Sequence, residues 1–285
     1  MTSTRALRRR IRSIQDTGKV CKAMEMIATA RMRRAQQQAK VGRPYAEKIG
    51  QVIADLVAGA PVGETHPLLQ KRDVEKIGIV HMATDRGLCG GLNTSLNHFV
   101  ARFISEQKVP VTLITVGRKG RAFMHHLGYD IRAEFSGIGD RPTLQETLAI
   151  SRVVIDDYSS GDVDLVYLSY PRFVNTAVQR PAVEVLLPVE PPRQAAARAT
   201  EYIYEPSLGS VLGDLLPRYV EVEVYHAILE LIASEQSARM VAMRSASDNA
   251  RELIAGLIMV LNKARQETIT EEICDISGVV EALAR

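Results

Sequence analysis

The sequence of 285 residues lacks several features that would assign it to a familiar class of protein. Its three cysteines, Cys21, Cys89 and Cys274, lack the close pairing that a zinc cluster or a redox motif needs. The longest uncharged stretch near the C-terminus, Leu253–Asn262, falls well short of the roughly 20 apolar residues that span a bilayer. These absences predict a soluble protein in a reducing, intracellular setting.

Motifs of known catalytic chemistry are also missing. The sequence contains no G-x-S-x-G, no H-E-x-x-H and no arrangement of paired carboxylates that spacing alone supports. Adjacent pairs such as His125-His126 and Asp156-Asp157 would point about 100° apart on a helix, so neither pair converges on one site. We therefore expect no enzyme active site, no metal site and no cofactor.

The near balance of charge hides a strong asymmetry along the chain. The formal net charge is +3. Residues 1–58 carry 13 lysines and arginines against 4 acids, residues 59–206 carry 16 against 17, and residues 207–285 carry 7 against 12. A basic beginning and an acidic end are expected to attract each other or to bind different partners.

The N-terminal 58 residues predict one long helix. Glycine and proline are absent before Gly18 and rare afterwards, although Pro44 is expected to bend or distort the helix locally. Steps of four and three residues mark a seam of small and half-apolar side chains with a repeat of about 3.5 residues. The seam consists of Leu7, Ile11, Ile14, Gly18, Cys21, Glu25, Ala28, Met32, Ala35 and Ala39.

The C-terminal segment predicts a second long helix, from about Leu208 to Leu283. Roughly 75 residues at 1.5 Å each make a rod of about 110 Å, too long for the middle of the chain to cover. Its own steps of three and four residues include Ala250, Leu253, Leu257, Leu261, Ala264 and Thr268. Matching repeats and opposite charge favour an antiparallel coiled coil of the two terminal helices.

The middle of the chain predicts an α/β domain. Runs rich in β-branched residues alternate with helical stretches, which is typical of a mostly parallel, Rossmann-like sheet. The expected strands are Glu75–Ala83, Val109–Val116, Asp130–Phe135, Val163–Tyr170 and Val178–Leu187, and the expected helices are Asn93–Gln107, Arg118–Leu127 and Leu144–Tyr158. Residues 59–63 and 188–200 mark its edges. The division is therefore a helix (1–58), an α/β domain (59–206) and a helix (207–285).

The loop after the first strand leaves two chemical alternatives open. Thr84–Asn93 places a G-x-x-G-G sequence between a strand and a helix, where nucleotide-binding folds hold phosphate. Its spacing matches neither common phosphate-loop motif, and a tight structural turn explains it equally well. Cys89 could act as a nucleophile at the helix N-terminus. No base is identified for it, so it could instead be a small buried side chain.

The basic first helix leaves a nucleic-acid-binding function open. Eight arginines in two groups could neutralise phosphates: Arg5, Arg8, Arg9, Arg10, Arg12, Arg31, Arg33 and Arg34. Against this reading, Tyr45 is the only aromatic residue of the helix, and no DNA- or RNA-binding module is recognisable. An acidic segment of the same chain also offers these arginines a partner.

Four segments together resemble one known family. They are Lys22–Ala28, Thr84–Asn93, Ser234–Met243 and Asn262–Gln266. Their order and spacing are similar to those of the gamma subunit of F-type ATP synthases, and the resemblance extends over essentially the whole chain.

This resemblance implies a mechanical function rather than a catalytic one. The terminal helices would form the central rotor shaft inside a ring of alternating alpha and beta subunits, with the α/β domain beside the epsilon subunit and the membrane ring of c subunits. Rotation would couple ion flow to ATP synthesis or hydrolysis at the beta subunits. The absence of a convincing transit segment favours a bacterium, in which the complex would lie at the cytoplasmic face of the plasma membrane as a peripheral assembly.

The resemblance also implies five partner contacts. Arg265 and Gln266 match positions that meet a loop of the beta subunit, and Met24 and Arg239 match positions near an acidic beta loop. Arg86 matches a basic position that faces the same subunits. Two of these residues have simpler explanations within the chain: Met24 could pack beside the seam, and Arg239 could pair with Glu235 one turn earlier on its own helix.

Overall fold

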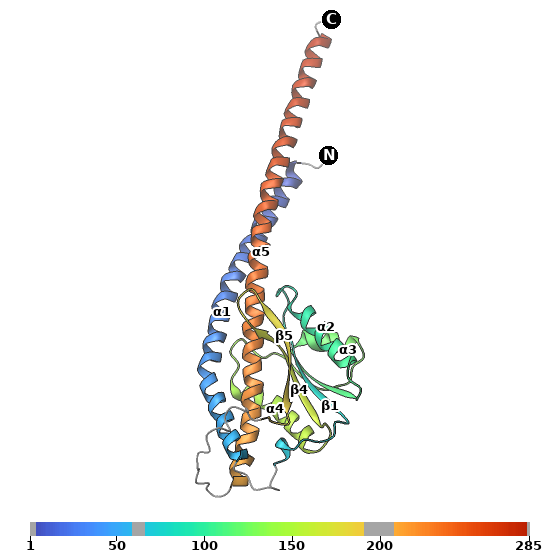
Figure 1. Ribbon diagram of the computed structural model, residues 1–285. Helices are drawn as coiled ribbons and strands as arrows, with labels where there is room; N and C mark the ends of the chain where they lie inside the picture. The colour runs from blue at the N-terminus through green and yellow to red at the C-terminus, as the bar shows by residue number, and fades with distance from the viewer. Residues whose placement is uncertain (1–3, 59–65, 191–207, 284–285) are drawn as a thin grey trace. The chain divides into compact units, whose positions relative to one another are not determined.

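The protein is built around a five-stranded sheet, seen in the computed structural model of Figure 1. The structure describes residues 4–58, 66–190 and 208–283, so the expected edge segments 59–63 and 191–200 lie outside the described residues. Contacts divide the chain into two compact units, one of residues 28–239 and one of residues 1–27 with 240–285. Both long helices run through both units.

The sheet confirms all five predicted strands. They are β1 (Ile77–Met82), β2 (Val111–Val116), β3 (Ile131–Phe135), β4 (Leu165–Phe173) and β5 (Gln179–Leu187). Their order is β3-β2-β1-β4-β5, and only β5 runs antiparallel to its neighbour. The central strand β1 is buried along its whole length, as expected of an apolar run covered on both faces.

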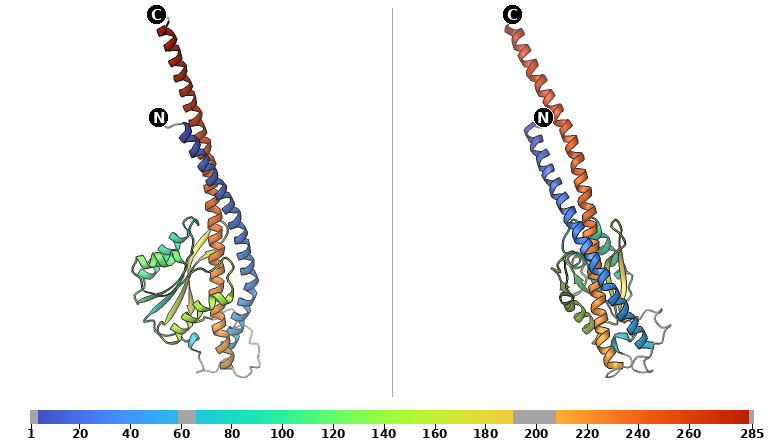
Figure 2. Two further views of the ribbon diagram at one scale, coloured as in Figure 1. Left: turned by 180° about the vertical axis from the view of Figure 1, so that it is seen from behind. Right: turned by 90° about the vertical axis from the view of Figure 1, so that its left-hand side faces the viewer.

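Helices cover both faces of the sheet, as the views in Figures 1 and 2 show. Helices α2 (Leu92–Ser105) and α3 (Arg118–His126) pack on one face through Leu96, Val100 and Met124. Helix α4 (Leu144–Ser159) packs on the other through Ile150 and Val154, together with segments of the two terminal helices. A short 3-10 helix, η1 (Pro67–Leu69), precedes β1.

The two long helices are α1 (Thr4–Ala58) and α5 (Leu208–Leu283). Within the unit of residues 28–239, Ile49 and Ile53 of α1 and Leu216, Val220 and Ile228 of α5 belong to the core on the α4 face of the sheet. Pro44 lies inside α1 and does not end the helix. Among the described residues, no helix combines the length and the hydropathy needed to cross a membrane.

The second unit is an antiparallel helix pair. A Cβ atom built on Gly18 of α1 would lie 3.3 Å from the Cβ of Ala250 on α5, and Arg244 of α5 lies 3.9 Å from Glu25 of α1. Residue numbers thus rise along one helix as they fall along the other. Each predicted seam position of α1 is buried or half-buried, which confirms the repeat in this helix.

On α5 the predicted repeat is partly wrong. Leu253 is 58% exposed and Thr268 is also exposed, so neither lies on the seam. The face that is at least half-buried consists of Met243, Ser247, Ala250, Ile254, Leu257, Leu261 and Ala264. The predicted repeat steps three residues from Ala250 to Leu253, whereas the covered face steps four residues to Ile254.

The seam of α5 stops opposite the first described residues of α1. Because Gly18 lies opposite Ala250, Thr4 lies opposite a position near Ala264. From Arg265 to Ser277, every residue of α5 is exposed. Isoleucine side chains on this stretch of helix are therefore left without cover from the described residues.

Gly120 of α3 is expected to tolerate no side chain. A Cβ there would lie 2.8 Å from the Cβ of Ala83 and 2.8 Å from Cδ2 of His81. Gly120→Ala should lower the free energy of unfolding by about 1–3 kcal/mol, as overpacking in a close-packed core does. Urea unfolding of the full chain measures this change.

Gly213→Ala on α5 is the matched control, since nothing lies within 4 Å of a Cβ at that position. Alanine in place of helical glycine should leave the stability unchanged or raise it by about 0.5–1 kcal/mol. Equal stability of the two variants would contradict the close packing at Gly120.

Candidate functional site

The loop between β1 and α2, residues 84–91, is closed by its own hydrogen bonds. The Thr84 hydroxyl donates to the carbonyl of Arg86 at 2.6 Å. Asn93, in the first turn of α2, donates through Nδ2 to Thr84 Oγ1 at 2.8 Å and accepts from the Thr84 amide at 3.2 Å. Leu88 has a positive φ of 63° and is 61% exposed. These bonds make the loop a fixed turn that presents Arg86 and Leu88 to solvent.

Asp85 ties this loop to two others. Its Oδ2 accepts from the amide of Gly137 at 2.8 Å, and its Oδ1 accepts from the amide of Arg118 at 3.0 Å, at the start of α3. The Arg118 side chain lies 3.6 Å from the same oxygen. A helix N-terminus attracts anions. Here a carboxylate of the chain itself occupies the place that a phosphate would take on α3.

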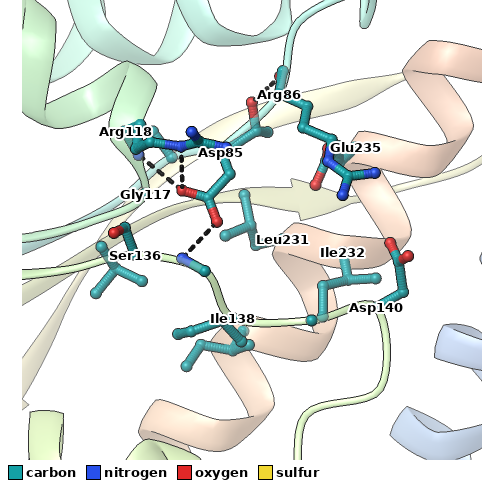
Figure 3. Close-up of a pocket in the computed structure, with 16 residues that line it drawn as sticks. Asp85, Arg86, Gly117, Arg118, Ser136, Ile138, Asp140, Leu231, Ile232 and Glu235 are labelled. Carbon is teal, nitrogen blue, oxygen red and sulfur yellow. Dashed lines mark hydrogen bonds and ion pairs between the residues drawn. The ribbon is translucent and has the colours of Figure 1, made fainter.

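A small cavity of about 140 Å³ lies between the carboxyl ends of β1, β2 and β3 and one face of α5. Figure 3 shows its apolar floor, which includes Ile138, Leu231 and Ile232, and its rim of charged side chains. The rim carboxylates are already engaged: Asp85 as above, Asp140 with Arg31 at 2.6 Å, and Glu235 with Arg239 at 2.5 Å. Other groups of the chain therefore engage all three carboxylates of the rim.

Arg239 is buried, with 7% of its surface exposed. Its Nη2 pairs with Oε1 of Glu235 one turn earlier on α5 and donates to the carbonyl of Gly87 at 3.1 Å. Burial raises the pKa of the Glu235 carboxyl, and the hydrogen bond and charge of Arg239 oppose that shift. The arginine thus joins α5 to the loop that carries Arg86.

Three more polar side chains of α5 contact the α/β layer, and the sequence interpretation did not single them out. Ser234 donates to the carbonyl of Pro171 at 2.7 Å, Ser237 donates to the carbonyl of Thr176 at 2.7 Å, and Gln236 donates to Asp140 at 3.0 Å. A sequence signal did exist. The polar run Ser234–Ser237 follows directly on residues 227–233, which are apolar except for Glu230. Polar residues on every side of a helix would need partners if that helix were buried.

Beneath the loop lies a buried polar layer centred on His81 of β1, which is fully buried. Its Nε2 lies 3.0 Å from Oδ1 of Asn97, and its Nδ1 lies 3.0 Å from Oγ of Ser169. An amide oxygen only accepts, so Nε2 donates and Nδ1 accepts the serine hydroxyl proton. Burial lowers the pKa of His81 to about 4, against the opposing effect of the bond to Asn97.

Cys89 is packed away from solvent, with 1% exposure. Burial raises the pKa of its thiol first, and the nearby Glu235 carboxylate raises it further, while Arg239 acts in the opposite direction. Asn93 Nδ2 lies 3.3 Å from its Sγ. A nucleophilic cysteine needs a lowered pKa, so these surroundings favour the small, buried side chain.

The five predicted contact residues lie in different places. Met24 is half-buried on α1, and Arg265 and Gln266 are exposed on α5, all within the helix-pair unit. Arg86 is exposed on its loop and Arg239 is buried on α5, both within the unit of residues 28–239. No residues of the described chain form a cluster of three or more metal-binding side chains.

The free part of α5 carries an apolar stripe. Ile269, Ile273, Ile276 and Val280 follow at steps of four, three and four residues and are 50%, 57%, 66% and 61% exposed. Such spacing places them on one face of the helix. An apolar face of this kind is typical of a surface that another protein covers.

Comparisons with known proteins identify the relatives of the chain. The family model described as ATP synthase matches residues 3–283. An ATP synthase gamma chain of Dehalococcoides mccartyi is 54% identical over the whole length of both chains. One of Herpetosiphon aurantiacus is 47% identical over 99% of each chain.

Solved structures agree with the fold. The central stalk of the mitochondrial ATP synthase of Tetrahymena thermophila, determined with its c-ring, contains a chain that is similar with a TM-score of 0.63 and 26% identity, over 80% of this chain and 99% of that one. A chain of the Euglena gracilis mitochondrial ATP synthase reaches a TM-score of 0.66 at 22% identity, over 98% and 94% of the two chains.

His81 makes the stability of the fold sensitive to acid. The unfolded chain binds a proton at His81 near pH 6.5, whereas the folded chain binds it only near pH 4. Between these values the unfolded state holds more protons, so stability falls as the pH falls from 6.5 to 4, by up to about 3 kcal/mol. Urea unfolding at a series of pH values measures this slope.

His81→Gln serves as the comparison, because its amide can still hydrogen-bond within the layer but does not titrate there. The variant should be less stable at neutral pH, with a shallower decline between pH 6.5 and pH 4. Parallel declines in the two proteins would show that His81 is not the group responsible.

Cys89 should react slowly with thiol reagents. In the folded chain, alkylation by N-ethylmaleimide at neutral pH should be at least about tenfold slower at Cys89 than at the exposed Cys274, because thiolate fraction and access both limit the reaction. Mass spectrometry of the two cysteine peptides measures both rates, and in denaturant they should become similar. Equal rates in the folded chain would revive a reactive role for Cys89.

Proposed function

Because the chain belongs to the ATP synthase gamma-chain family, we propose that it is the rotating central shaft of an F-type ATP synthase. It couples ion flow through a membrane ring of c subunits to ATP synthesis and hydrolysis on the beta subunits, and it catalyses no reaction itself. Relatives of 44–54% identity over nearly the full length support this proposal. A non-catalytic role is also supported by the cavity rim, where Asp140 and Glu235 are paired with the chain's own Arg31 and Arg239.

The exposed end of α5 is the observation that supports the proposal most directly. Beyond Ala264 the helix continues to Leu283, past the stretch opposite the described residues of α1, and its isoleucine stripe is half-exposed or more. A single helix with an apolar stripe requires cover from other chains. A ring of subunits around the shaft supplies that cover on all sides of the helix.

The contacts with the ring are assigned to residues near this end and to the loop after β1. Arg265 and Gln266 lie at the start of the free helix and would meet a loop of the beta subunit. Met24 would lie near an acidic loop of the beta subunit, and Arg86 would face the same subunits. Arg239 stays a predicted partner contact, although its present partners, Glu235 and Gly87, belong to the chain itself.

Each of the three predicted parts of the chain then has its own place in the complex. Helices 1–58 and 207–285 form the shaft, and residues 59–206 form the foot beside the epsilon subunit and the c-ring. The related chain of Tetrahymena thermophila comes from a central stalk with a c-ring, which supports these partners. The assembly would lie at the cytoplasmic face of a bacterial plasma membrane, held there through the complex alone.

Co-expression with the alpha, beta, epsilon and c subunits of the same organism tests the proposal. An affinity tag on the beta subunit should retain the chain at one copy per ring, and the purified complex should hydrolyse ATP. Recovery of the chain free of these subunits, bound instead to DNA or RNA at physiological salt, would contradict the proposal and support nucleic-acid binding through the arginines of α1.

Met24→Lys should impair coupling more than assembly. The added cation would lie near acidic partners and would lower the free energy of the shaft at one angle. Rotation away from that angle would then have to cross a higher barrier. A surface ion pair of up to about 1 kcal/mol would lower the ratio of ions pumped to ATP hydrolysed by roughly two- to fivefold. Vesicle assays of pumping and hydrolysis measure that ratio.

Met26→Lys is the matched control, since Met26 is 60% exposed two residues further along α1. It introduces the same charge on a different side of the helix, and its ratio should stay close to that of the unaltered complex. If Met24→Lys pumps as efficiently as Met26→Lys, the contact assigned to Met24 is wrong.

A further inference from the structure

A six-residue stretch of α5, from Ser234 to Arg239, buries polar side chains on every side of the helix. Ser234, Gln236, Ser237 and Arg239 are exposed by 0%, 1%, 0% and 7%. Since successive residues of a helix turn by about 100°, these four positions point in directions spread around the whole helix axis. Burying a polar group is unfavourable unless it is hydrogen-bonded, so each of them requires a partner.

The partners lie on four separate segments of the α/β layer. Ser234 reaches the carbonyl of Pro171 within β4, and Ser237 reaches that of Thr176 in the hairpin between β4 and β5. Gln236 reaches Asp140, which precedes α4, and Arg239 reaches Gly87 after β1. Hydrogen bonds from four segments thus reach α5 from several directions within the same six residues of the helix.

Asp140 extends this arrangement to the other long helix. Its Oδ1 accepts the bond from Gln236 of α5, and its Oδ2 lies 2.6 Å from Nη1 of Arg31 on α1. One carboxylate of the α/β layer therefore contacts both terminal helices. All these residues belong to the unit of residues 28–239, and Arg239 is the last residue of α5 within it.

Apolar contacts and hydrogen bonds restrain a helix differently. Two further hydrogen bonds join α5 to this layer: Glu230 accepts from the amide of Phe173 at 2.7 Å, and Tyr225 donates to the carbonyl of Pro142 at 3.3 Å. The other contacts of α5 with the sheet side are largely apolar, as at Leu216. Apolar contact is non-directional and permits small rotations about the helix axis. Hydrogen bonds require alignment of donor and acceptor, so bonds around the axis resist rotation of the helix against the layer.

We propose that Ser234, Gln236, Ser237 and Arg239, with Asp140 as the shared acceptor, form a polar clamp that transmits torque between the α/β layer and α5. This inference rests on the proposed function, in which rotation of the foot must reach the shaft without slip. The four are positioning residues: they fix the angle of the helix and contact no substrate.

The double variant Ser234→Ala, Ser237→Ala tests the clamp in the complete complex. Each lost hydrogen bond of this kind shifts an equilibrium by roughly two- to tenfold. The complex should still hydrolyse ATP, while the number of ions pumped per ATP in membrane vesicles should fall by roughly tenfold. Single-molecule recordings of rotor angle should broaden in parallel.

Ser245→Ala is the matched control. Ser245 lies on the same helix and is exposed, so its hydroxyl contributes nothing to the clamp. Pumping, hydrolysis and angular width should all match the unaltered complex. A loss of stability alone would reduce the amount of complex recovered, but it would leave the ratio of pumping to hydrolysis in the recovered complex unchanged.

An exchange of partners provides a second, independent test. Gln236→Glu places a carboxylate against Asp140 and should uncouple the complex through repulsion of like charges. Adding Asp140→Asn supplies an amide donor for that carboxylate, so the pair should recover coupling that Gln236→Glu lacks. This exchange decides the question even if the double serine variant does not assemble.

Two results would overturn the clamp. Normal pumping both in the double serine variant and in Gln236→Glu would show that these hydrogen bonds carry no torque. Asp140→Asn alone shows the effect of weakening the ion pair with Arg31. If that variant couples normally yet does not restore coupling in the Gln236→Glu background, this contact does not act through its hydrogen bond. Failure of the proposed function is a different result, because the unaltered chain would then be missing from the purified ATPase.

Discussion

The structure depends on one constraint: a single helix of 76 residues must satisfy three different surroundings along its length. Its first part is buried against the α4 face of the sheet, its middle part pairs with α1, and its last part is exposed. Each surrounding asks for different side chains. Residues 227–234 are buried or half-buried on every side, residues 243–264 keep one narrow seam, and the residues beyond carry an apolar stripe in another phase. The proposed rotor shaft uses all three parts of α5: the buried part, the paired part and the exposed part.

The sequence allowed most of the fold to be predicted, because most of the fold follows from local patterns. The strands are runs of β-branched residues, and the seam of α1 is a repeat that one helix face preserves over ten positions. Leu253 shows where such reasoning fails. On α5 the apolar residues lie on several sides, so periodicity did not decide between Leu253 and Ile254, and only the partner helix fixes which of them is covered.

The polar contacts of the site could not be predicted in this way. The acceptors of Ser234, Gln236, Ser237 and Arg239 lie between 61 and 152 residues away along the chain. The order of strands in the sheet decides which loops contact α5. A polar run in the helix sequence does not reveal that order. The loop after β1 illustrates the same limit. Its sequence left phosphate binding and a tight structural turn open, and the hydrogen bonds of Thr84 with Arg86 and Asn93 show a turn that the loop closes by itself.

The pairing of Gly18 with Ala250 has a consequence for how the protein is made. The first half of α1 leaves the ribosome long before its partner does, since about 230 residues separate the two positions. At roughly 5–20 residues per second, the early helix waits about 10 to 50 s with its seam uncovered. During that time the intervening sheet can fold, but the helix pair cannot. Synthesis therefore lets the strands of the sheet pair before the helix pair can close.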